Sequence, residues 1–356
     1  MDDIAFIARP DQVTPDWLTT VLRAAGATDE GTVLDVHATP VGTGQVGECV
    51  RFGLTWDDAD AGPATVLGKF PSDDETSRAT ATAVRTYEVE TRFYQQLRSR
   101  VDIAAPVPHY AQIDMATHDF AIVMNDLAPA EQGDQIAGCT PDEAAIAVEE
   151  VAKLHAPLWG DSTLAGLEWM NRSSPEGLRG IVDMVWPGFL ERYAGRLDPE
   201  VEAAGSSLVE RLEAYLSWRP EQLTAVHGDY RLDNMLFDPS PGGVPMTTVD
   251  WQTVSHGPGV QDVAYFIGTG LEPGLRAEVE RDLVKEYHAT LRAGGVKDQS
   301  FDACWDQYRR YAFAGFIMAM ISSMIVGQTD RGDEMFMAMA NRSGRMALDL
   351  DTLGML

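Results

Sequence analysis

The sequence reads Ala225-Val-His-Gly-Asp-Tyr-Arg-Leu-Asp-Asn-Met-Leu-Phe237 and then, after a short turn, Thr247-Thr-Val-Asp-Trp251. A short apolar run leads into a turn that contains Asp229, and Asn234 follows five residues later. A second β-like run ends on Asp250. The intervening residues 238–245 are dense in Pro, Gly and Ser, which predicts a hairpin between the two runs. The hairpin is expected to bring Asn234 and Asp250 near each other, with Asp229 as a further carboxylate.

The order and spacing of these three side chains are typical of phosphoryl transfer. In protein kinases a carboxylate base, an Asn five residues on, and an Asp at the end of the next hairpin handle the acceptor hydroxyl and Mg-ATP. Hard Mg²⁺ prefers carboxylate and amide oxygens, which Asp250 and Asn234 provide. Arg231 lies two residues after Asp229. Its guanidinium could reach the γ-phosphate or the substrate, or form a surface salt bridge, and both interpretations stay open.

Length and charge limit the classes of protein. At 356 residues the chain exceeds one typical domain, so two packed lobes are expected, and 45% hydrophobic residues can bury a sizeable core. The formal net charge of -28 argues against binding to nucleic acid or to anionic membrane surfaces, because such contacts need Lys and Arg. An acidic exterior could favour a cationic substrate, but a solvated acidic surface is the simpler explanation of the charge.

Cysteine usage and the apolar segments indicate a cytoplasmic protein. Cys49, Cys139 and Cys304 are odd in number and far apart, so they form no disulfide framework. The N-terminus has acids where a signal peptide would have a basic region, and no long apolar core follows it. Residues 311–327 are apolar but short for a membrane span and carry charges on both flanks, which predicts a buried helix instead.

A glycine-rich segment near the N-terminus is the first candidate for nucleotide binding. Gly42, Gly44 and Gly47 follow a predicted strand over 34–41 and precede a second one over 50–56. A dinucleotide-binding turn requires a helix after the third glycine, whereas the pattern after Gly47 has period two. The segment therefore predicts a strand-loop-strand lid whose backbone N–H groups approach nucleotide phosphates, with an ordinary hairpin loop as the alternative.

Lys69 and Glu90 are the next candidates. Lys69 lies in a predicted strand over 64–70, and a predicted helix over 79–98 places Glu90 in the middle of its apolar stripe while Glu88 points away. A carboxylate on an apolar stripe is costly unless a cation meets it, and Lys69 is the natural partner. Such a pair would hold the ammonium against the ATP phosphates. Alternatively, Glu90 reaches solvent at the edge of the stripe.

The middle of the chain contains a strand-to-linker step and a capped helix. The apolar run 119–124 ends at Met124 and is followed by Asp126, where a kinase-like protein would read the adenine edge with backbone groups. The side chain of Asp126 is more simply a cap or turn residue. Thr140 starts a helix with a capping box, and His155 on its apolar face is expected to be a hydrogen-bonded core histidine.

With these motifs collected, the chain resembles the aminoglycoside phosphotransferase and choline kinase-like superfamily, and within it most closely the ecdysteroid kinase-like phosphotransferases. The resemblance covers nearly the whole chain, and its specific part is the pairing of His-Gly-Asp…Asn with Asp-Trp. The matching stretches are Gly42-x-Gly-x-x-Gly47, Lys69, Glu90-Thr-Arg-Phe-Tyr94, Val123-Met-Asn-Asp-Leu127, Leu154-His-Ala156, His227-Gly-Asp-x-x-x-x-Asn234, Val249-Asp-Trp251 and Gly257-Pro-x-x-x-Asp262.

The resemblance implies an α+β, bilobal protein kinase-like fold, with a β-rich N-lobe over 1–124 and a mostly helical C-lobe over 125–356. It also implies transfer of the ATP γ-phosphate to a hydroxyl of a small molecule. Asp262 matches a family position that ties the catalytic loop down, and Asn125-Asp126 departs from relatives that often show two acids there. The implied roles are Asp229 as catalytic base, Asn234 and Asp250 as Mg²⁺ ligands, and Gly42, Gly44, Gly47, Lys69, Glu90, Met124 and Asp126 as nucleotide-binding residues.

The sequence leaves the acceptor open. An amino-sugar such as an aminoglycoside would suit the acidic charge, whereas a sterol-like alcohol would suit the ecdysteroid kinase-like resemblance. A catalytically silent nucleotide-binding or scaffold protein on the same fold is the competing hypothesis, although each metal and base position carries a suitable side chain. A Rossmann-type dehydrogenase would need a helix after Gly47. The choice between ATP and GTP and the oligomeric state are open as well.

Overall fold

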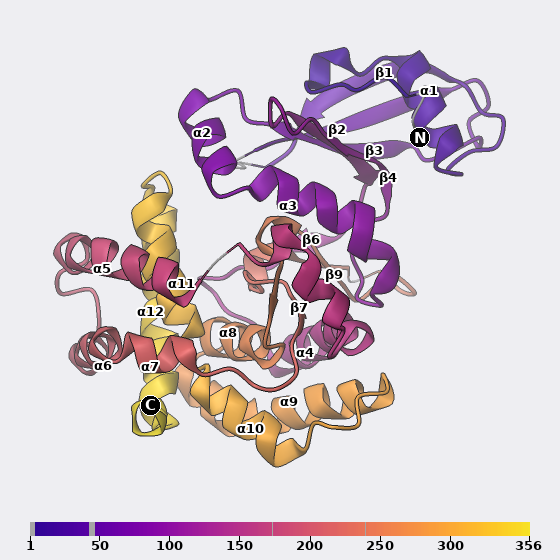
Figure 1. Ribbon diagram of the computed structural model, residues 1–356. Coiled ribbons are helices and arrows are strands. Elements are labelled where there is room, and N and C mark those ends of the chain that lie inside the picture. The colour runs from indigo at the N-terminus through magenta and orange to yellow at the C-terminus, as the bar shows by residue number, and fades with distance from the viewer. Residues whose placement is uncertain (1–3, 43–46, 173, 239) are drawn as a thin grey trace. The chain divides into compact units, whose positions relative to one another are not determined.

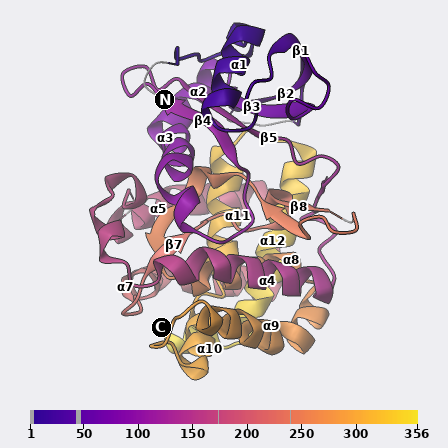
Figure 2. The ribbon, with the colours of Figure 1, turned by 90° about the vertical axis from the view of Figure 1, so that its right-hand side faces the viewer.

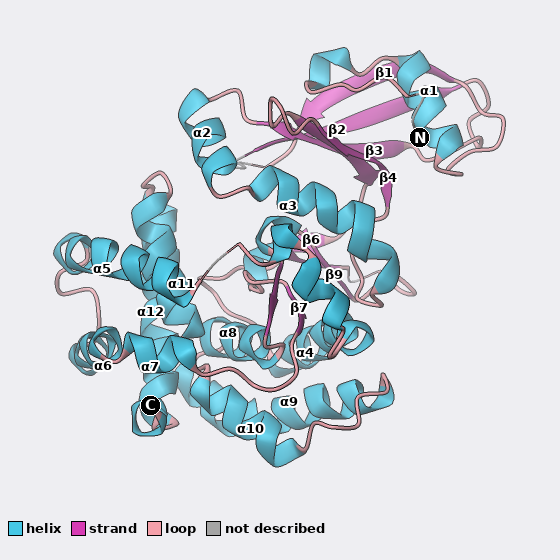
Figure 3. Cartoon of the chain, viewed as in Figure 1, coloured by secondary structure: helices cyan, strands magenta, loops and turns pink. Residues whose placement is uncertain are grey.

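The computed structural model of the chain describes residues 4–42, 47–172, 174–238 and 240–356. The chain forms two compact units. Unit 1 comprises Met1–Ser99, Ala105–Pro129 and Val249–Thr253, and unit 2 comprises Arg100–Ala104, Ala130–Thr248 and Val254–Leu356. The course of the chain can be followed in Figure 1, and Figure 3 shows that the long strands belong to unit 1 while helices dominate unit 2.

Unit 1 is built on a five-stranded antiparallel sheet with the strand order β1-β2-β3-β5-β4. Helix α1 (Pro15–Ala24), capped by Thr14, covers one face of the sheet and packs Trp17 and Leu22 into a core with Phe52 and Phe70. The strands are β1 (Val33–Pro40), β2 (Gly47–Trp56), β3 (Thr65–Pro71), β4 (Pro108–Ile113) and β5 (Phe120–Asn125). Since side chains alternate along a strand, Lys69 in β3 points to the face opposite that of Phe70.

The helical segment after β3 differs from the single helix that the sequence predicts over 79–98. Helix α2 (Glu75–Ala83) ends, Arg85 adopts a left-handed backbone with φ 61°, and α3 (Thr86–Arg92) continues as a π-helical turn, Phe93–Leu97. The Thr-rich sequence before the break has low helix propensity, which favours termination there. Glu88, expected to point away, is buried as well, and its carboxylate pairs with Arg85 at 2.8 Å.

Residues 249–253 belong to unit 1 although the chain around them belongs to unit 2. The ring of Trp251 is fully buried and stacks on Phe93, with ring centroids 3.9 Å apart and an interplanar angle of 2°. Aromatic stacking of this kind adds about 0.5–1.5 kcal/mol to the burial of the rings. Trp251 therefore fixes its neighbour Asp250 to the helical segment that begins with α3.

Unit 2 is mostly helical, with two small antiparallel sheets of short strands. The predicted hairpin after Asn234 is confirmed by β8 (Met235–Phe237), which pairs with β9 (Met246–Thr248). On its other edge β8 pairs with β6 (Glu131–Gln132), and in the second small sheet β7 (Thr224–Val226) pairs with β10 (Ser255–Gly257). The helices are α4 (Pro141–His155), α5 (Pro175–Arg192), α6 (Pro199–Glu210), α7 (Leu212–Ser217), α8 (Val260–Gly270), α9 (Pro273–Ala293), α10 (Phe301–Arg310), α11 (Ala314–Ile325) and α12 (Asp330–Asp349).

The helices of unit 2 pack against one another. Figure 2 shows α4 and α9 alongside each other, and α11 packs against both α12 and α5. Thr140 and Glu143 form the predicted capping box of α4. The apolar run 311–327 forms the predicted buried helix, α11, and among the described residues no helix is long and apolar enough to cross a membrane.

Candidate active site

The loop after β7 in unit 2 is held by a buried carboxylate. Oδ2 of Asp262 accepts a hydrogen bond from the backbone N–H of His227 at 2.6 Å, and its Oδ1 accepts one from Gly228 at 3.0 Å. His155, which is fully buried, lies with Nε2 3.3 Å from Asp262 and with Nδ1 2.9 Å from the Tyr287 hydroxyl. These hydrogen bonds confirm the prediction that Asp262 holds this loop in place. They also confirm the prediction that His155 is a hydrogen-bonded histidine of the core.

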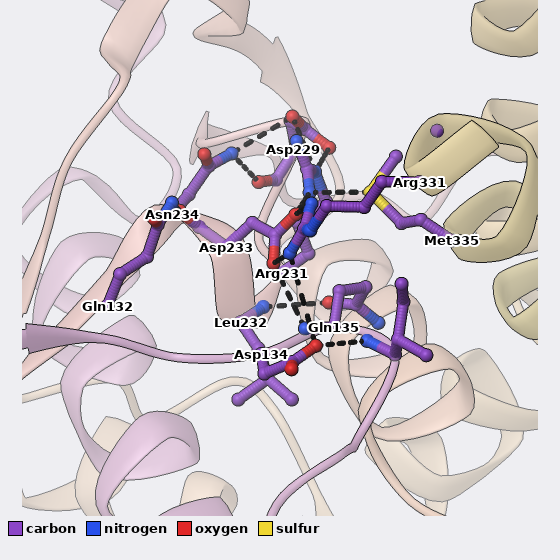
Figure 4. A network of polar contacts seen from close by, with 12 residues as sticks. Gln132, Asp134, Gln135, Asp229, Arg231, Leu232, Asp233, Asn234, Arg331 and Met335 are labelled. Carbon is purple, nitrogen blue, oxygen red and sulfur yellow. Dashed lines mark hydrogen bonds and ion pairs between the residues drawn. The ribbon is translucent and has the colours of Figure 1, made fainter. Parts of the chain in front are cut away.

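Asp229 follows at the end of this loop, and three side chains donate to its carboxylate. The Tyr265 hydroxyl lies 2.6 Å from Oδ1, Nε of Arg231 lies 3.1 Å from both oxygens, and Nδ2 of Asn234 lies 2.9 Å from Oδ2. Figure 4 shows Arg231 and Asn234 converging on Asp229. Burial acts to raise the pKa of Asp229, but the Arg231 cation and the Tyr265 hydrogen bond outweigh it and lower that pKa. Asp229 is therefore an ionised carboxylate at neutral pH.

Asn234 lies at the end of a 3₁₀ turn, Leu232–Asn234, that leads into β8. Its side-chain nitrogen donates to the backbone oxygen of Asp229 at 2.9 Å as well as to the carboxylate. Because the two atoms of a side-chain amide point in different directions, these bonds leave the amide oxygen on the side away from Asp229. An amide oxygen in that position can serve as a ligand of a hard cation.

Arg231 joins Asp229 to a second buried carboxylate. Nη1 of Arg231 lies 2.8 Å from the carboxylate of Asp233. The same carboxylate accepts a hydrogen bond from the backbone N–H of Gln135 at 3.0 Å and hydrogen bonds from both Nη groups of Arg331 at 3.1 and 3.2 Å. Burial acts to raise the pKa of Asp233, but Arg331 and Arg231 outweigh it and lower that pKa. The side chain of Arg231 is 18% exposed, so its ion pairs are largely buried rather than surface salt bridges.

Unit 1 contains a second cluster of charged side chains. The predicted ion pair between Lys69 and Glu90 is part of this cluster. Nζ of Lys69 lies 2.7 Å from both oxygens of Glu90 and 3.5 Å from Oδ1 of Asp250. Glu90 is 3% exposed, which excludes the alternative that it reaches solvent. Burial acts to lower the pKa of Lys69, but Glu90 and Asp250 outweigh it and raise that pKa well above its ordinary value. Lys69 is therefore a fixed ammonium.

Asp250 has an uncommon backbone conformation, with φ 65° in the left-handed region. Asp tolerates this region better than most residues because its short polar side chain can bond locally, and here Nε2 of Gln252 donates to Oδ2 at 3.0 Å. The side chain is 28% exposed. The stacked Trp251 and this strained backbone together hold a partly exposed carboxylate beside Lys69, where it is able to bind a cation.

The glycine segment and the strand-to-linker step also lie in unit 1. Gly42 follows β1 with φ 75° and Gly47 begins β2, whereas Gly44 lies outside the described residues. A strand begins at Gly47, which excludes the helix that a dinucleotide-binding turn requires.

At the end of β5, Met124 is buried. The carboxylate of Asp126 accepts a hydrogen bond from Nε of Arg51 at 2.5 Å and one from the backbone N–H of Ala128 at 3.2 Å. The bond to Ala128, two residues later, confirms Asp126 as a turn residue.

Removing the carboxylate of Glu90 is expected to destabilise the protein. Glu90→Ala leaves a largely buried ammonium, and breaking a buried pair in this way lowers the free energy of unfolding by about 3 kcal/mol. Glu88→Ala is the matched control on the same helix, because its partner Arg85 is 30% exposed and can turn to water; we expect a loss of about 1 kcal/mol there. Urea unfolding of both variants measures the difference, and equal losses would contradict it.

The sequence did not single out three residues of the charged network: Tyr265, Asp233 and Arg331. Tyr265 lies three residues after Asp262, on the same face of α8, so helical periodicity could have pointed to it. Asp233 directly precedes Asn234 and could have been included with it. Arg331, in the first turn of α12, carries no local signal, because only tertiary structure brings it to the loop.

Comparison with known proteins places the chain in a family. Residues 75–309 match the model of the phosphotransferase enzyme family, APH. A stretch of 83 residues is 31% identical to mouse acyl-CoA dehydrogenase family member 10; it covers 22% of this chain and 8% of that protein, so the match spans less than a tenth of the mouse protein.

Solved structures share the fold at low identity. A putative aminoglycoside phosphotransferase from Ralstonia eutropha JMP134 has 15% identity, covers 93% of this chain and 97% of that one, and gives a TM-score of 0.52. Plasmodium vivax ethanolamine kinase has 10% identity over 94% and 84% of the two chains, with a TM-score of 0.53. A microcompartment-associated aminopropanol kinase has 16% identity over 94% and 99%, also with a TM-score of 0.53.

These similarities confirm the predicted kinase-like fold, with a β-sheet part and a mostly helical part. The closer likeness to ecdysteroid kinase-like phosphotransferases stays a prediction. Since the family model covers more than half of the chain, from Glu75 in α2 to Arg309 in α10, this protein belongs to the phosphotransferase enzyme family.

Proposed function

We propose that the chain is an ATP-dependent kinase that transfers the γ-phosphate to a hydroxyl group of a small molecule. The observation that carries the proposal is the ionised carboxylate of Asp229, held by Tyr265, Arg231 and Asn234. In this proposal residues 1–124 form the nucleotide-binding lobe and residues 125–356 the catalytic lobe. Family membership supports a phosphotransferase, and the hydroxyl acceptor and the nucleotide are the proposed additions.

The residues of both units suit Mg-ATP. Lys69 would pair with the α- and β-phosphates, and Asp250 and Asn234 would hold Mg²⁺, which fits because each can offer an oxygen: a partly exposed carboxylate in one case and an outward amide oxygen in the other. A metal ion held by these two residues would supply positive charge that neutralises the charge developing during transfer. The backbone N–H groups at Gly42 and Gly47 would approach the phosphates, and the step from Met124 to Asp126 would read the adenine edge.

Asp229 would orient the acceptor hydroxyl and accept its proton. A carboxylate offers about four lone-pair sites, and Tyr265, Asn234 and the two contacts of Arg231 occupy them. The contacts of Arg231 are the longest, and Arg231 retains Asp233 as a second partner. We therefore expect the hydroxyl to displace Nε of Arg231, whose guanidinium then becomes available to the phosphoryl oxygens.

The acceptor class has support from proteins of the same fold. Ethanolamine kinase, aminopropanol kinase and the choline kinase of Cryptosporidium parvum are named for small alcohols, which supports a hydroxyl acceptor here. An amino-sugar and a sterol-like alcohol are the two candidates that the sequence suggests. The cytoplasmic location stays a prediction.

The proposal is tested by incubating the full-length protein with Mg-ATP and a panel of hydroxylated compounds. The panel contains amino-sugars, sterol-like alcohols, amino alcohols, hydroxy acids, sugars and sugar phosphates. We expect one class to release ADP and to gain the mass of one phosphate. If the protein binds ATP but no compound and no cell-extract metabolite gains phosphate, the alternative of a silent nucleotide-binding protein replaces this one.

A further inference from the structure

Tyr265 is held firmly beside the proposed base. It lies in α8, which is buried from Asp262 to Gly270, and it is only 3% exposed. Gly315 of α11 packs directly against the ring, because a Cβ atom at that position would lie only 3.1 Å from Cδ2 of Tyr265. Packing this close leaves a side chain few other positions. The hydroxyl therefore meets Asp229 from a fixed direction, at 2.6 Å from Oδ1.

Helix α8 supports the catalytic loop at two levels. The carboxylate of Asp262 accepts hydrogen bonds from the backbone N–H groups of His227 and Gly228, which fixes the main chain just before the base. Tyr265, three residues later on the same face, donates to the carboxylate of the base itself. Burial and the nearby charge of Asp229 raise the pKa of Tyr265 well above its ordinary value, so the phenol stays a protonated donor. One helix therefore fixes both the loop and the rotation of the carboxylate.

The ion pair between Asp229 and Arg231 is not in its strongest form. A guanidinium binds a carboxylate most strongly through two parallel N–H···O bonds of about 2.7–2.9 Å. Here a single N–H, at Nε, is shared by both oxygens of Asp229 at 3.1 Å, while Nη1 turns to Asp233 at 2.8 Å. Among the described residues, the bond from Tyr265 is the shortest that the Asp229 carboxylate accepts. The phenol thus holds this carboxylate more closely than the guanidinium does.

We propose that Tyr265 is a positioning residue for phosphoryl transfer: it keeps the Asp229 carboxylate from closing a two-bond ion pair with Arg231 and so keeps the base accessible to the acceptor hydroxyl. The inference rests on the proposed kinase function and adds a residue to its machinery. Without the phenol, Oδ1 loses its shortest hydrogen bond and the carboxylate turns toward the guanidinium. The acceptor hydroxyl then has to displace a stronger ion pair before Asp229 can take its proton.

The kinetic test removes the phenol hydroxyl with Tyr265→Phe. The probe is Mg-ATP with the compound of the screening panel that the wild type phosphorylates fastest. We expect kcat/KM for this compound to fall by about 10- to 100-fold, the usual effect of losing a hydrogen bond to a charged group. The nucleotide dissociation constant should stay within about twofold, because Tyr265 contacts the base and acts through it.

Tyr308→Phe is the matched control. Tyr308 of α10 is also buried, and its hydroxyl donates to the carboxylate of Glu280 in α9 at 2.8 Å. Both variants lose a buried bond between a phenol and a carboxylate, so urea unfolding should show similar losses of stability, whereas only Tyr265→Phe should lose turnover. In the Asp229→Asn background, Tyr265→Phe should change kcat/KM by less than about twofold, since no charged carboxylate is left to pair with Arg231.

Two kinetic results would overturn the inference: an unchanged kcat/KM in Tyr265→Phe, or an equal loss in Tyr308→Phe. Should Tyr265→Phe fail to fold, NMR of the wild type and Asp229→Asn decides, with tyrosine labelled at Cζ, the carbon that carries the hydroxyl. One of the ten tyrosine signals should shift far more than the others when the charged oxygen becomes a neutral one. A spectrum without such a shift contradicts the contact.

The two arms separate this inference from the proposed function, because the NMR measurement needs no acceptor. If the labelled signal shifts but the wild type phosphorylates no compound, the kinase proposal fails while the contact between Tyr265 and Asp229 stands. If the wild type phosphorylates the probe and Tyr265→Phe does so equally fast, the kinase proposal stands and the positioning role of Tyr265 fails.

Discussion

Replacing Asp229 by asparagine is expected to lower the kcat of phosphoryl transfer by about 10²- to 10⁴-fold, the usual contribution of a positioned general base. The amide has nearly the same shape, so the Tyr265 and Asn234 contacts can persist with modest rearrangement. What is lost is the negative charge that orients the hydroxyl and accepts its proton. The nucleotide dissociation constant is expected to stay within about twofold, because Asp229 acts on the acceptor rather than on the nucleotide.

The control for Asp229→Asn is Asp282→Asn, an exposed aspartate of α9 that pairs only with the nearby Lys285 among the described contacts. That variant removes the same charge at a distance from the catalytic loop and should keep full activity. Thermal unfolding of both variants shows whether either fold is altered. Unchanged turnover in Asp229→Asn, with nucleotide binding intact, would remove Asp229 from the role of base.

The lowered pKa of Asp229 also predicts the pH dependence of turnover. Burial alone would raise this pKa, but Arg231 and Tyr265 lower it below the ordinary value, so the carboxylate stays deprotonated at neutral pH. A deprotonated base is the active form, and activity controlled by Asp229 falls only as pH drops through its lowered pKa. In a plot of kcat/KM against pH, we therefore expect no fall near neutral pH that is due to protonation of Asp229.

Replacing Asp250 by asparagine is expected to have the second large effect, a weakening of Mg²⁺-dependent nucleotide binding by about 100-fold or more. Losing a residue that only supports a metal ligand costs about 10- to 100-fold in metal affinity, so losing a ligand carboxylate should cost at least as much. Asn adopts the left-handed backbone as readily as Asp, so the conformation at φ 65° and the stacking of Trp251 should survive. Lys69 keeps Glu90 as its partner.

This effect is measured by titrating nucleotide with and without Mg²⁺. In the wild type Mg²⁺ should strengthen binding strongly, and in Asp250→Asn the two titrations should nearly coincide. Asp58→Asn, in the exposed turn after β2, is the control with the same charge change in unit 1 and should behave like the wild type. If Mg²⁺ strengthens binding equally in Asp250→Asn, Asp250 is not a metal ligand.

The fold was largely predictable because its motifs are local. The strands around the glycine segment, the capping box at Thr140 and the hairpin after Asn234 each depend on short-range patterns of period two, on capping chemistry or on turn residues. The pairing of Lys69 with Glu90 was predictable for a related reason: a carboxylate on an apolar stripe must find a cation.

The parts that could not be predicted depend on tertiary contacts or on small local energies. The helix break at Arg85 replaces one predicted helix by two, because weak helix formers allow a left-handed residue that no sequence pattern marks. Arg331 is about a hundred residues from Asp233 in the chain and meets it only through the packing of α12. The buried stacking of Trp251 on Phe93 likewise joins distant segments.

The most direct test is to follow the phosphate itself. The wild type and Asp229→Asn would be incubated with Mg-ATP carrying a labelled γ-phosphate, together with the acceptor that the screen identifies, and the product would be analysed by mass spectrometry and phosphorus NMR. We predict a phosphate ester on the acceptor oxygen, formed by the wild type and reduced by about 10²-fold or more in Asp229→Asn. A phosphate bonded to nitrogen, or an ester formed equally fast by both proteins, would contradict the assignment of Asp229 as the base of a hydroxyl kinase.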